Sequence, residues 1–144
     1  MNNSKEKVLI VGCKIDMIDK CVACSRCLKA FNERDDEFKG LSSSAELIGL
    51  LDCGGCPGVA MGARLNEFKF WNKPPMGDLP THVFIGICIT AKNQAGEYIC
   101  PYAKNIIETI HTKMETDPST GMDPTGKFKT HKGTHLKGKQ NLHP

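Results

Sequence analysis

One short stretch, Cys53-Gly54-Gly55-Cys56-Pro57-Gly58, constrains the fold of this chain most, because it combines two thiols with three glycines. The apolar run before it, residues 45–52, predicts a buried strand, and the run from Val59 predicts a helix. That helix has apolar residues at helical spacing, namely Met61, Leu65, Phe68 and Trp71. Glycine allows a sharp turn and the close approach of a bound group. We therefore interpret the stretch as a metal or redox site between a strand and a helix.

The proline that follows each of two cysteines predicts where two helices begin. Proline suits the first helical position, where its missing N–H would have had no partner. This places Cys56 at or beside the N-cap of one helix, and Cys100-Pro101 repeats the pattern for the last helix. A thiol at a helix N-cap faces backbone N–H groups and the positive end of the helix dipole, which favour the thiolate.

Composition limits the class of protein. A chain of 144 residues with 40% hydrophobic and 24% charged residues predicts a single domain over residues 1–144, with a basic tail from about residue 115. The net charge of +3 is too small to indicate nucleic-acid binding, and no segment is long enough to span a membrane. The apolar run at 8–11 is shorter than a signal-peptide core, so we expect a cytoplasmic protein. Its eight cysteines then indicate metal ligation or thiol chemistry instead of disulfides.

Strands alternate with helices along the chain. We predict strands at 8–12, 45–52 and 82–87 and a weaker fourth at 128–135. This order predicts an α/β fold, a small three-layer, flavodoxin-like parallel sheet of about four strands. Cysteines follow three successive strands, at Cys13, Cys53 and Cys88. Ligands of such sheets bind beyond the carboxyl ends of the strands, so we expect Cys-rich loops to converge there.

Two further helices are predicted with less chemistry. A modest helix with Leu28, Ala30 and Phe31 on one face runs to about Arg34, and the charged residues 34–37 predict a solvated loop. The last helix has a longer apolar face, formed by Ala103, Ile106, Ile107, Ile110 and Met114.

These cysteines also carry a family resemblance. The chain resembles the CGGC-domain family of small proteins through motifs that span most of its length. They are Cys13, Cys21, Cys53 to Gly58, Cys88-Ile89, Cys100-Pro101 and Gly133-Thr134-His135. The resemblance implies zinc binding by cysteines and histidines with no established reaction, and it implies His135 as a ligand. Cys24 and Cys27 look like additions to the commonest pattern of the family.

Two kinds of metal site remain open from the residues. Zinc takes four Cys or His ligands in a tetrahedron, which this ligand set could supply. Cys21, Cys24 and Cys27 also match the first three ligands of a bacterial ferredoxin run, and a remote Cys-Pro, at Cys56 or Cys100, could complete a [4Fe-4S] cluster. The candidate metal ligands are Cys13, Cys21, Cys24, Cys27, Cys53, Cys56, Cys88, Cys100 and His135.

A different class of function is thiol-disulfide exchange by the pair Cys53 and Cys56. Such an active site does not need six further cysteines, so we rank this oxidoreductase second. The expected partners are a metal ion or cluster and a redox protein, with neither nucleic acid nor a membrane.

Overall fold

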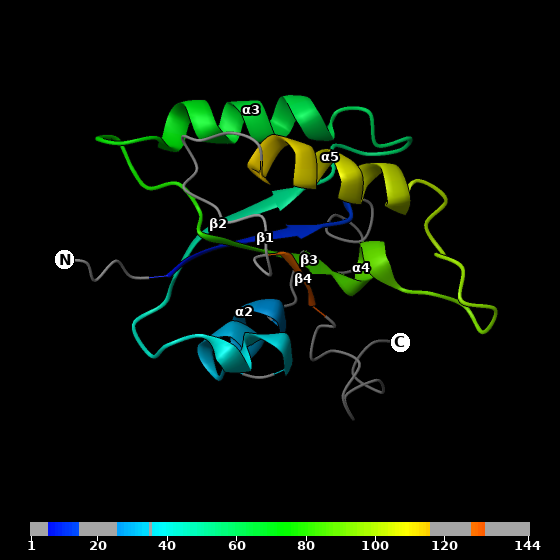
Figure 1. The fold of residues 1–144 in the computed structure, drawn as a ribbon, viewed down its shortest axis with the longest axis horizontal. Helices are drawn as coiled ribbons and strands as arrows, with labels where there is room; N and C mark the ends of the chain where they lie inside the picture. The colour runs from blue at the N-terminus through cyan, green and yellow to red at the C-terminus, as the bar shows by residue number, and fades with distance from the viewer. Residues whose placement is uncertain (1–5, 15–25, 35, 116–127, 132–144) are drawn as a thin grey trace.

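The computed structural model describes residues 6–14, 26–34, 36–115 and 128–131 (Figure 1). Its centre is a sheet in the order β2-β1-β3-β4 in which every neighbouring pair is parallel. The strands are β1 (Lys7–Gly12), β2 (Glu46–Asp52), β3 (His82–Gly86) and β4 (Phe128–His131). The predicted α/β class with a parallel sheet is confirmed, and the runs of β-branched and aliphatic residues account for the first three strands.

Helices lie on both faces of the sheet. Figure 1 shows α3 and α5 side by side over one face and α2 against the other. The helical segments are α2 (Arg26–Asn32), the 3-10 helix η1 (Asp36–Gly40), α3 (Met61–Asn72), α4 (Ile87–Thr90) and α5 (Ala103–Glu115). None of the described helices is both long enough and apolar enough to cross a membrane.

The two faces of the sheet bury two separate hydrophobic clusters. β1 shows the division, because Leu9 and Val11 point into one cluster while Val8 and Ile10 point into the other. The α3/α5 core comprises Leu9, Val11, Cys53, Met61, Leu65, Val83, Ile85, Ile89, Ala103, Ile106, Ile110 and Met114. The α2 core comprises Val8, Ile10, Ala30, Phe31, Phe38, Leu41, Ala45 and Phe84. A parallel sheet covered on both faces has continuous apolar strands, as β1 has here.

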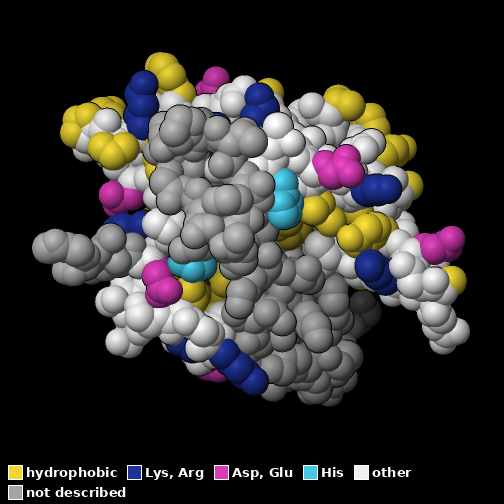
Figure 2. All heavy atoms as spheres, viewed as in Figure 1, with side chains coloured by type: hydrophobic (Ala, Val, Ile, Leu, Met, Phe, Trp, Pro, Cys, Tyr) yellow, Lys and Arg dark blue, Asp and Glu magenta, His cyan; other side chains and the backbone are white. Residues whose placement is uncertain are grey.

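Four of the five residues predicted for the apolar face of α5 are buried and the fifth, Ile107, is half-buried, whereas the apolar residues of α3 are buried only in part. Ala103, Ile106, Ile110 and Met114 of α5 are all buried. In α3, Met61 and Leu65 are fully buried, whereas Trp71 is 61% exposed. The helical spacing of these residues predicted the helix correctly, but Trp71 lies on its solvent side. Its ring stacks edge-on against Phe70 at 5.2 Å, and its Nε1 donates to Glu67 Oε1 at 2.9 Å. Figure 2 shows exposed hydrophobic side chains at the upper left, where the end of α3 lies in Figure 1.

Part of the segment predicted as a solvated loop is helical, because Asp36 and Glu37 belong to the 3-10 helix η1. Arg34 donates from Nε to Ser42 O at 3.0 Å and from Nη2 to Ala45 O at 3.1 Å, and its guanidinium lies over the Phe31 ring. Phe38 of η1 is fully buried, with its ring 4.5 Å from that of Phe84. Burial of this one aromatic ring fixes η1 against the α2 core, so the prediction of a loop was wrong for Asp36 and Glu37.

An ion pair anchors the amino end of β2. Lys7 Nζ lies 2.7 Å from Glu46 Oε1 and 3.4 Å from Asp78 Oδ2. The hydrogen bond to Glu46 raises the pKa of Lys7 above its ordinary value, and Asp78 raises it further. This pair lies at the amino end of β2, whereas Cys53 follows the carboxyl end of the same strand.

Candidate functional site

Three cysteines lie just beyond the carboxyl ends of three neighbouring strands. Cys13 follows β1, Cys53 follows β2, and Cys88 lies in α4 directly after β3. The Cys53 N–H donates to Gly12 O at 3.0 Å, which extends the β1–β2 ladder by one step. The Cys13 N–H donates to Cys88 Sγ at 3.0 Å and so links the ends of β1 and β3. Segments separated by dozens of residues in the chain thus share one edge of the sheet.

The sulfur of Cys88 occupies a space that a glycine leaves open. A Cβ atom on Gly86 would lie 3.2 Å from Cys88 Sγ and 3.4 Å from Val11 O, so a larger residue there would crowd both. The space lies between β1 and β3, and β2 and β4 flank this pair on opposite sides. It is the point where the strand order reverses, which is where open α/β sheets bind ligands.

The two cysteines of the central motif have different surroundings. Cys53 is only 4% exposed and belongs to the α3/α5 core, whereas Cys56 is exposed, and both are free thiols. The loop between them turns at Gly54, with φ +85°, and Gly55, with φ +97°, and both values favour glycine. One thiol is therefore held in the interior while the other is available at the surface.

Neither Cys-Pro pair opens its helix. The first helix, α3, begins at Met61 with Ala60 as its N-cap, so the predicted placement of Cys56 beside the N-cap was wrong. Gly58 explains the delay, because its φ of +87° is left-handed and no helix can continue through it from Pro57. A helix dipole acts mainly within the first turn, and Cys56 precedes the N-cap of α3.

The last helix starts late in the same way. It begins at Ala103, and the Ala103 N–H donates to Cys100 O at 3.2 Å in the preceding turn. Cys100 is half-buried and packs against the α3/α5 core, as do Cys13 and Cys88. Four cysteines, counting Cys53, therefore border a single core cluster.

The other candidate ligands lie elsewhere or outside the described residues. Cys27 packs against the α2 core, on the other face of the sheet. A histidine outside the candidate set, His131, ends β4, and its Cα pairs with that of Gly86 at the carboxyl edge. Cys21, Cys24 and His135 fall outside the described residues, so the predicted cluster run and the histidine ligand stay predictions.

The donor chemistry suits a thiophilic metal, but the described donors do not form a closed site. Thiolate sulfur selects zinc, copper(I) and iron-sulfur clusters. Within the described ranges, no three side chains of His, Cys, Asp or Glu are gathered closely enough to hold a metal ion. A complete ligand sphere at this edge would need side chains to turn or ligands from outside the described residues.

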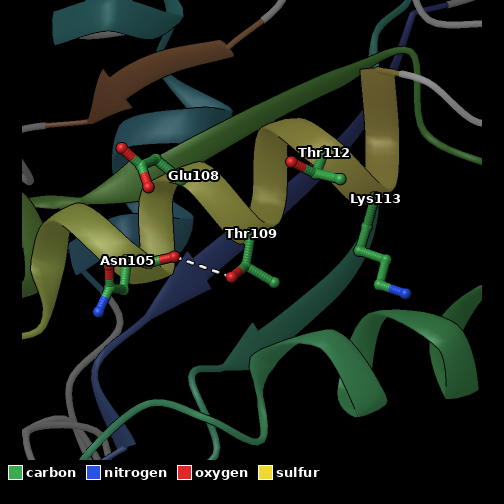
Figure 3. Close-up of a pocket in the computed structure, with 5 residues that line it drawn as sticks. All are labelled: Asn105, Glu108, Thr109, Thr112 and Lys113. Carbon is green, nitrogen blue, oxygen red and sulfur yellow. Dashed lines mark hydrogen bonds between the residues drawn. The ribbon is translucent and has the colours of Figure 1, made fainter.

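A depression on α5 is separate from the cysteines. Figure 3 shows that it is lined by Asn105, Glu108, Thr109, Thr112 and Lys113. Thr109 Oγ1 donates to Asn105 O at 2.8 Å along the helix itself. Such a hydroxyl is already engaged within its helix, and the lining has neither a thiol nor an imidazole, so we assign no chemistry to this depression.

One charged pair beside the motif was not predicted from the sequence. Asp52, the last residue of β2, pairs with Arg64 of α3. The sequence did contain a signal for this pair. Asp52 directly precedes Cys53 and Arg64 lies in the helix after the turn, so the two can meet when the chain reverses. Hydrophobic periodicity does not register such a contact.

Comparison with known families agrees with these residues. The model of the CGGC domain matches residues 7–120, which includes the three cysteine-bearing strand ends and the central motif. No curated protein and no solved structure matches the chain significantly. Since the match covers most of the sequence, the chain belongs to the CGGC-domain family.

Proposed function

We propose that this CGGC-domain protein binds a thiophilic metal through thiolates at the carboxyl edge of its sheet. The observation that carries the proposal is the link from the Cys13 N–H to Cys88 Sγ at 3.0 Å, with Cys53 held beside them by Gly12. Three cysteines from three strand ends are otherwise unexpected at one edge. A reducing cytoplasm would preserve these thiols as ligands.

The ligands that we propose for zinc are Cys13, Cys53, Cys88 and Cys100, since all four border the α3/α5 core. Zinc would supply a positive charge at the centre of a tetrahedron of ligands, and this charge would offset the repulsion of the gathered thiolates. His135 remains a further candidate by family resemblance. The sheet order β2-β1-β3-β4 supports a flavodoxin-like arrangement, in which the ligand lies between the first and third strands.

An iron-sulfur cluster is the other metal centre that we consider. It would use Cys21, Cys24 and Cys27 with Cys56 or Cys100 as the remote fourth ligand. Cys56 is exposed and could meet ligands from another segment. A redox protein would then be the partner.

Anaerobic purification with metal analysis and a visible spectrum distinguishes these centres. A zinc site is colourless, whereas a cluster absorbs broadly in the visible range and releases acid-labile sulfide. Replacing Cys24 and Cys27 together by serine should abolish the absorbance of a cluster but leave bound zinc unchanged. A purified chain that holds neither metal, and takes up neither on reconstitution, would refute metal binding.

A second function, thiol-disulfide exchange, is favoured by the contrast between exposed Cys56 and buried Cys53. In that reaction the Cys56 thiolate would attack a substrate disulfide and release one substrate thiolate. Cys53 would then displace the second substrate thiolate and leave a Cys53–Cys56 disulfide. Turnover of a disulfide substrate by the metal-free chain, with an added dithiol that reduces the Cys53–Cys56 disulfide after each cycle and with activity lost in Cys56→Ser, would favour this function over metal binding.

A further inference from the structure

We propose that Arg64 is a positioning residue for the cysteine loop and acts through Asp52. The inference rests on the proposed function in one respect, since the loop positioned is the one that carries Cys53 and Cys56. Arg64 lies outside the cysteine motif, and its hydrogen bonds go to Asp52.

The guanidinium of Arg64 holds Asp52 in three ways. Its Nη2 donates to Asp52 Oδ2 at 3.0 Å, and its Nε lies 2.9 Å from Oδ1. The same Nε donates to the backbone oxygen of Asp52 at 3.2 Å. Two carboxylate oxygens and one carbonyl therefore fix the end of β2 to α3, and the two-pronged contact sets a direction as well as a distance.

The carboxylate of Asp52 passes this constraint into the loop. The Gly54 N–H donates to Asp52 Oδ1 at 2.7 Å, on the same oxygen that Arg64 Nε approaches. A Cβ atom on Gly54 would lie 2.9 Å from Arg64 Cδ and 2.7 Å from Ala60 Cβ. The aliphatic part of Arg64 thus covers the glycine while its head group holds the residue two positions earlier.

Cys53 is consequently held on both sides. Its own N–H donates to Gly12 O. Of its two neighbours, Asp52 accepts from Arg64, and Gly54 donates its N–H to the Asp52 carboxylate. The far side of the loop is fixed separately, because the Gly58 N–H donates to Gly55 O at 2.7 Å. Cys56 lies between these anchors. Loss of Arg64 would therefore free the start of the segment that carries both sulfurs.

Lysine could not replace arginine here. An ammonium is a point charge that cannot present two parallel N–H donors to a carboxylate. The pair is also partly exposed, with 39% of the Arg64 side chain and 21% of the Asp52 side chain accessible, so its contribution to overall stability is modest. Its main effect should therefore be local geometry, which separates positioning from general stabilisation.

The test compares Arg64→Gln and Arg64→Lys with a matched control, Glu46→Gln. The control breaks another ion pair of the same strand, at its opposite end, where Lys7 Nζ lies 2.7 Å from Glu46. Zinc affinity is measured by competition with a chelator, and thermal unfolding checks that each variant folds. We expect both Arg64 variants to bind zinc about tenfold more weakly or worse, as for lost outer-shell partners of metal ligands. Glu46→Gln should bind like the wild type.

Alkylation of the metal-free proteins decides the role of Arg64 independently of metal binding. Cys53 is nearly inaccessible, so iodoacetamide should label it slowly in the wild type and in Glu46→Gln. In both Arg64 variants we expect labelling about tenfold faster, because the loop opens locally. Equal labelling of Cys53 in all four proteins would overturn the positioning role. If the wild type binds zinc, equal zinc affinity of the wild type and both Arg64 variants would overturn it too. A wild type that binds no metal would refute the proposed function alone, and the labelling result would still decide this inference.

Discussion

Three glycines shape the cysteine loop at the scale of single residues. Gly54, Gly55 and Gly58 all have left-handed φ values, which residues with a Cβ rarely adopt. Gly58 also touches α5, because a Cβ there would lie 2.8 Å from Ile106 Cγ1. The chain at this point must turn and approach a neighbouring helix closely, and both needs exclude a side chain.

Gly58→Ala should therefore destabilise the protein more than Gly96→Ala. Both positions have left-handed φ values, +87° and +82°, so both variants incur a backbone cost of about 1 kcal/mol. Only Gly58 would add a steric overlap, since nothing lies within 4 Å of a Cβ on Gly96. We expect ~1 to 3 kcal/mol of additional loss at Gly58, from the overpacking of a close contact. Urea denaturation measures both, and equal midpoints would contradict the contact.

The placement of the cysteines could be predicted, but the start of the helices could not. Cys13, Cys53 and Cys88 each follow a run of apolar residues, and parallel strands end at one edge, so their common position follows from topology. Cys56 and Cys100 were placed at helix starts from the proline that follows each of them. That rule considers one residue, whereas the true start depends on Gly58 and its contact with α5.

At the scale of elements, α3 shows how burial differs from hydrophobicity. The helix packs Leu65 into the α3/α5 core and leaves Trp71 on the solvent side. On the side of α5, Lys69 Nζ donates to Lys113 O at 2.8 Å, which fixes how α3 is rotated. Periodicity identifies α3 as a helix but does not decide which of its apolar residues are buried, because the exposed Trp71 also recurs at helical spacing.

Truncating Leu65 should cost far more than truncating the larger Trp71. Leu65→Ala removes a fully buried side chain and should lower the free energy of unfolding by ~2 to 5 kcal/mol. Trp71→Ala removes a side chain that is 61% exposed and should cost only about 0.5 to 1 kcal/mol. Chemical denaturation of both variants checks this. A larger loss for Trp71→Ala would mean that α3 is rotated differently on the sheet.

The 3-10 helix η1 could not be predicted for a related reason. Its segment is rich in charge and contains one aromatic residue, Phe38, so the local composition indicates a loop. The structure buries that ring between Phe31 and Phe84, which come from a helix and a distant strand. Contacts between residues far apart in the sequence decide such a segment, and a local pattern does not contain them.

At the scale of the whole molecule, the sheet separates two cores and gathers the thiols along one of them. Cys13, Cys53, Cys88 and Cys100 border the α3/α5 core, and Cys27 borders the α2 core. Thiolates brought together without a cation repel one another, so metal should couple to folding. The strand ends would loosen when the metal is removed.

Metal removal should therefore lower the melting temperature and expose the thiols. A ligated thiolate has its lone pairs engaged and alkylates slowly, whereas the same thiol reacts faster once a chelator has removed the metal. We expect the half-buried proposed ligands Cys88 and Cys100 to be protected from iodoacetamide in the zinc-loaded protein and labelled after chelation, whereas exposed Cys56 should be labelled in both states. Melting curves at increasing zinc should rise with concentration, as for any ligand that binds only the native state. Rapid labelling of Cys88 and Cys100 in the zinc-loaded protein, without metal loss, would contradict their role as ligands.

The metal content of single cysteine variants tests the central claim most directly. Wild type, Cys53→Ser, Cys88→Ser and Cys27→Ser are purified anaerobically in parallel, and bound zinc and iron are measured per folded chain. A hydroxyl is a poor replacement for a soft thiolate, so Cys53→Ser and Cys88→Ser should lose most of the bound metal. Cys27→Ser should keep its zinc, because Cys27 packs against the α2 core. Wild-type metal content in both Cys53→Ser and Cys88→Ser would contradict a metal site at the carboxyl edge of the sheet.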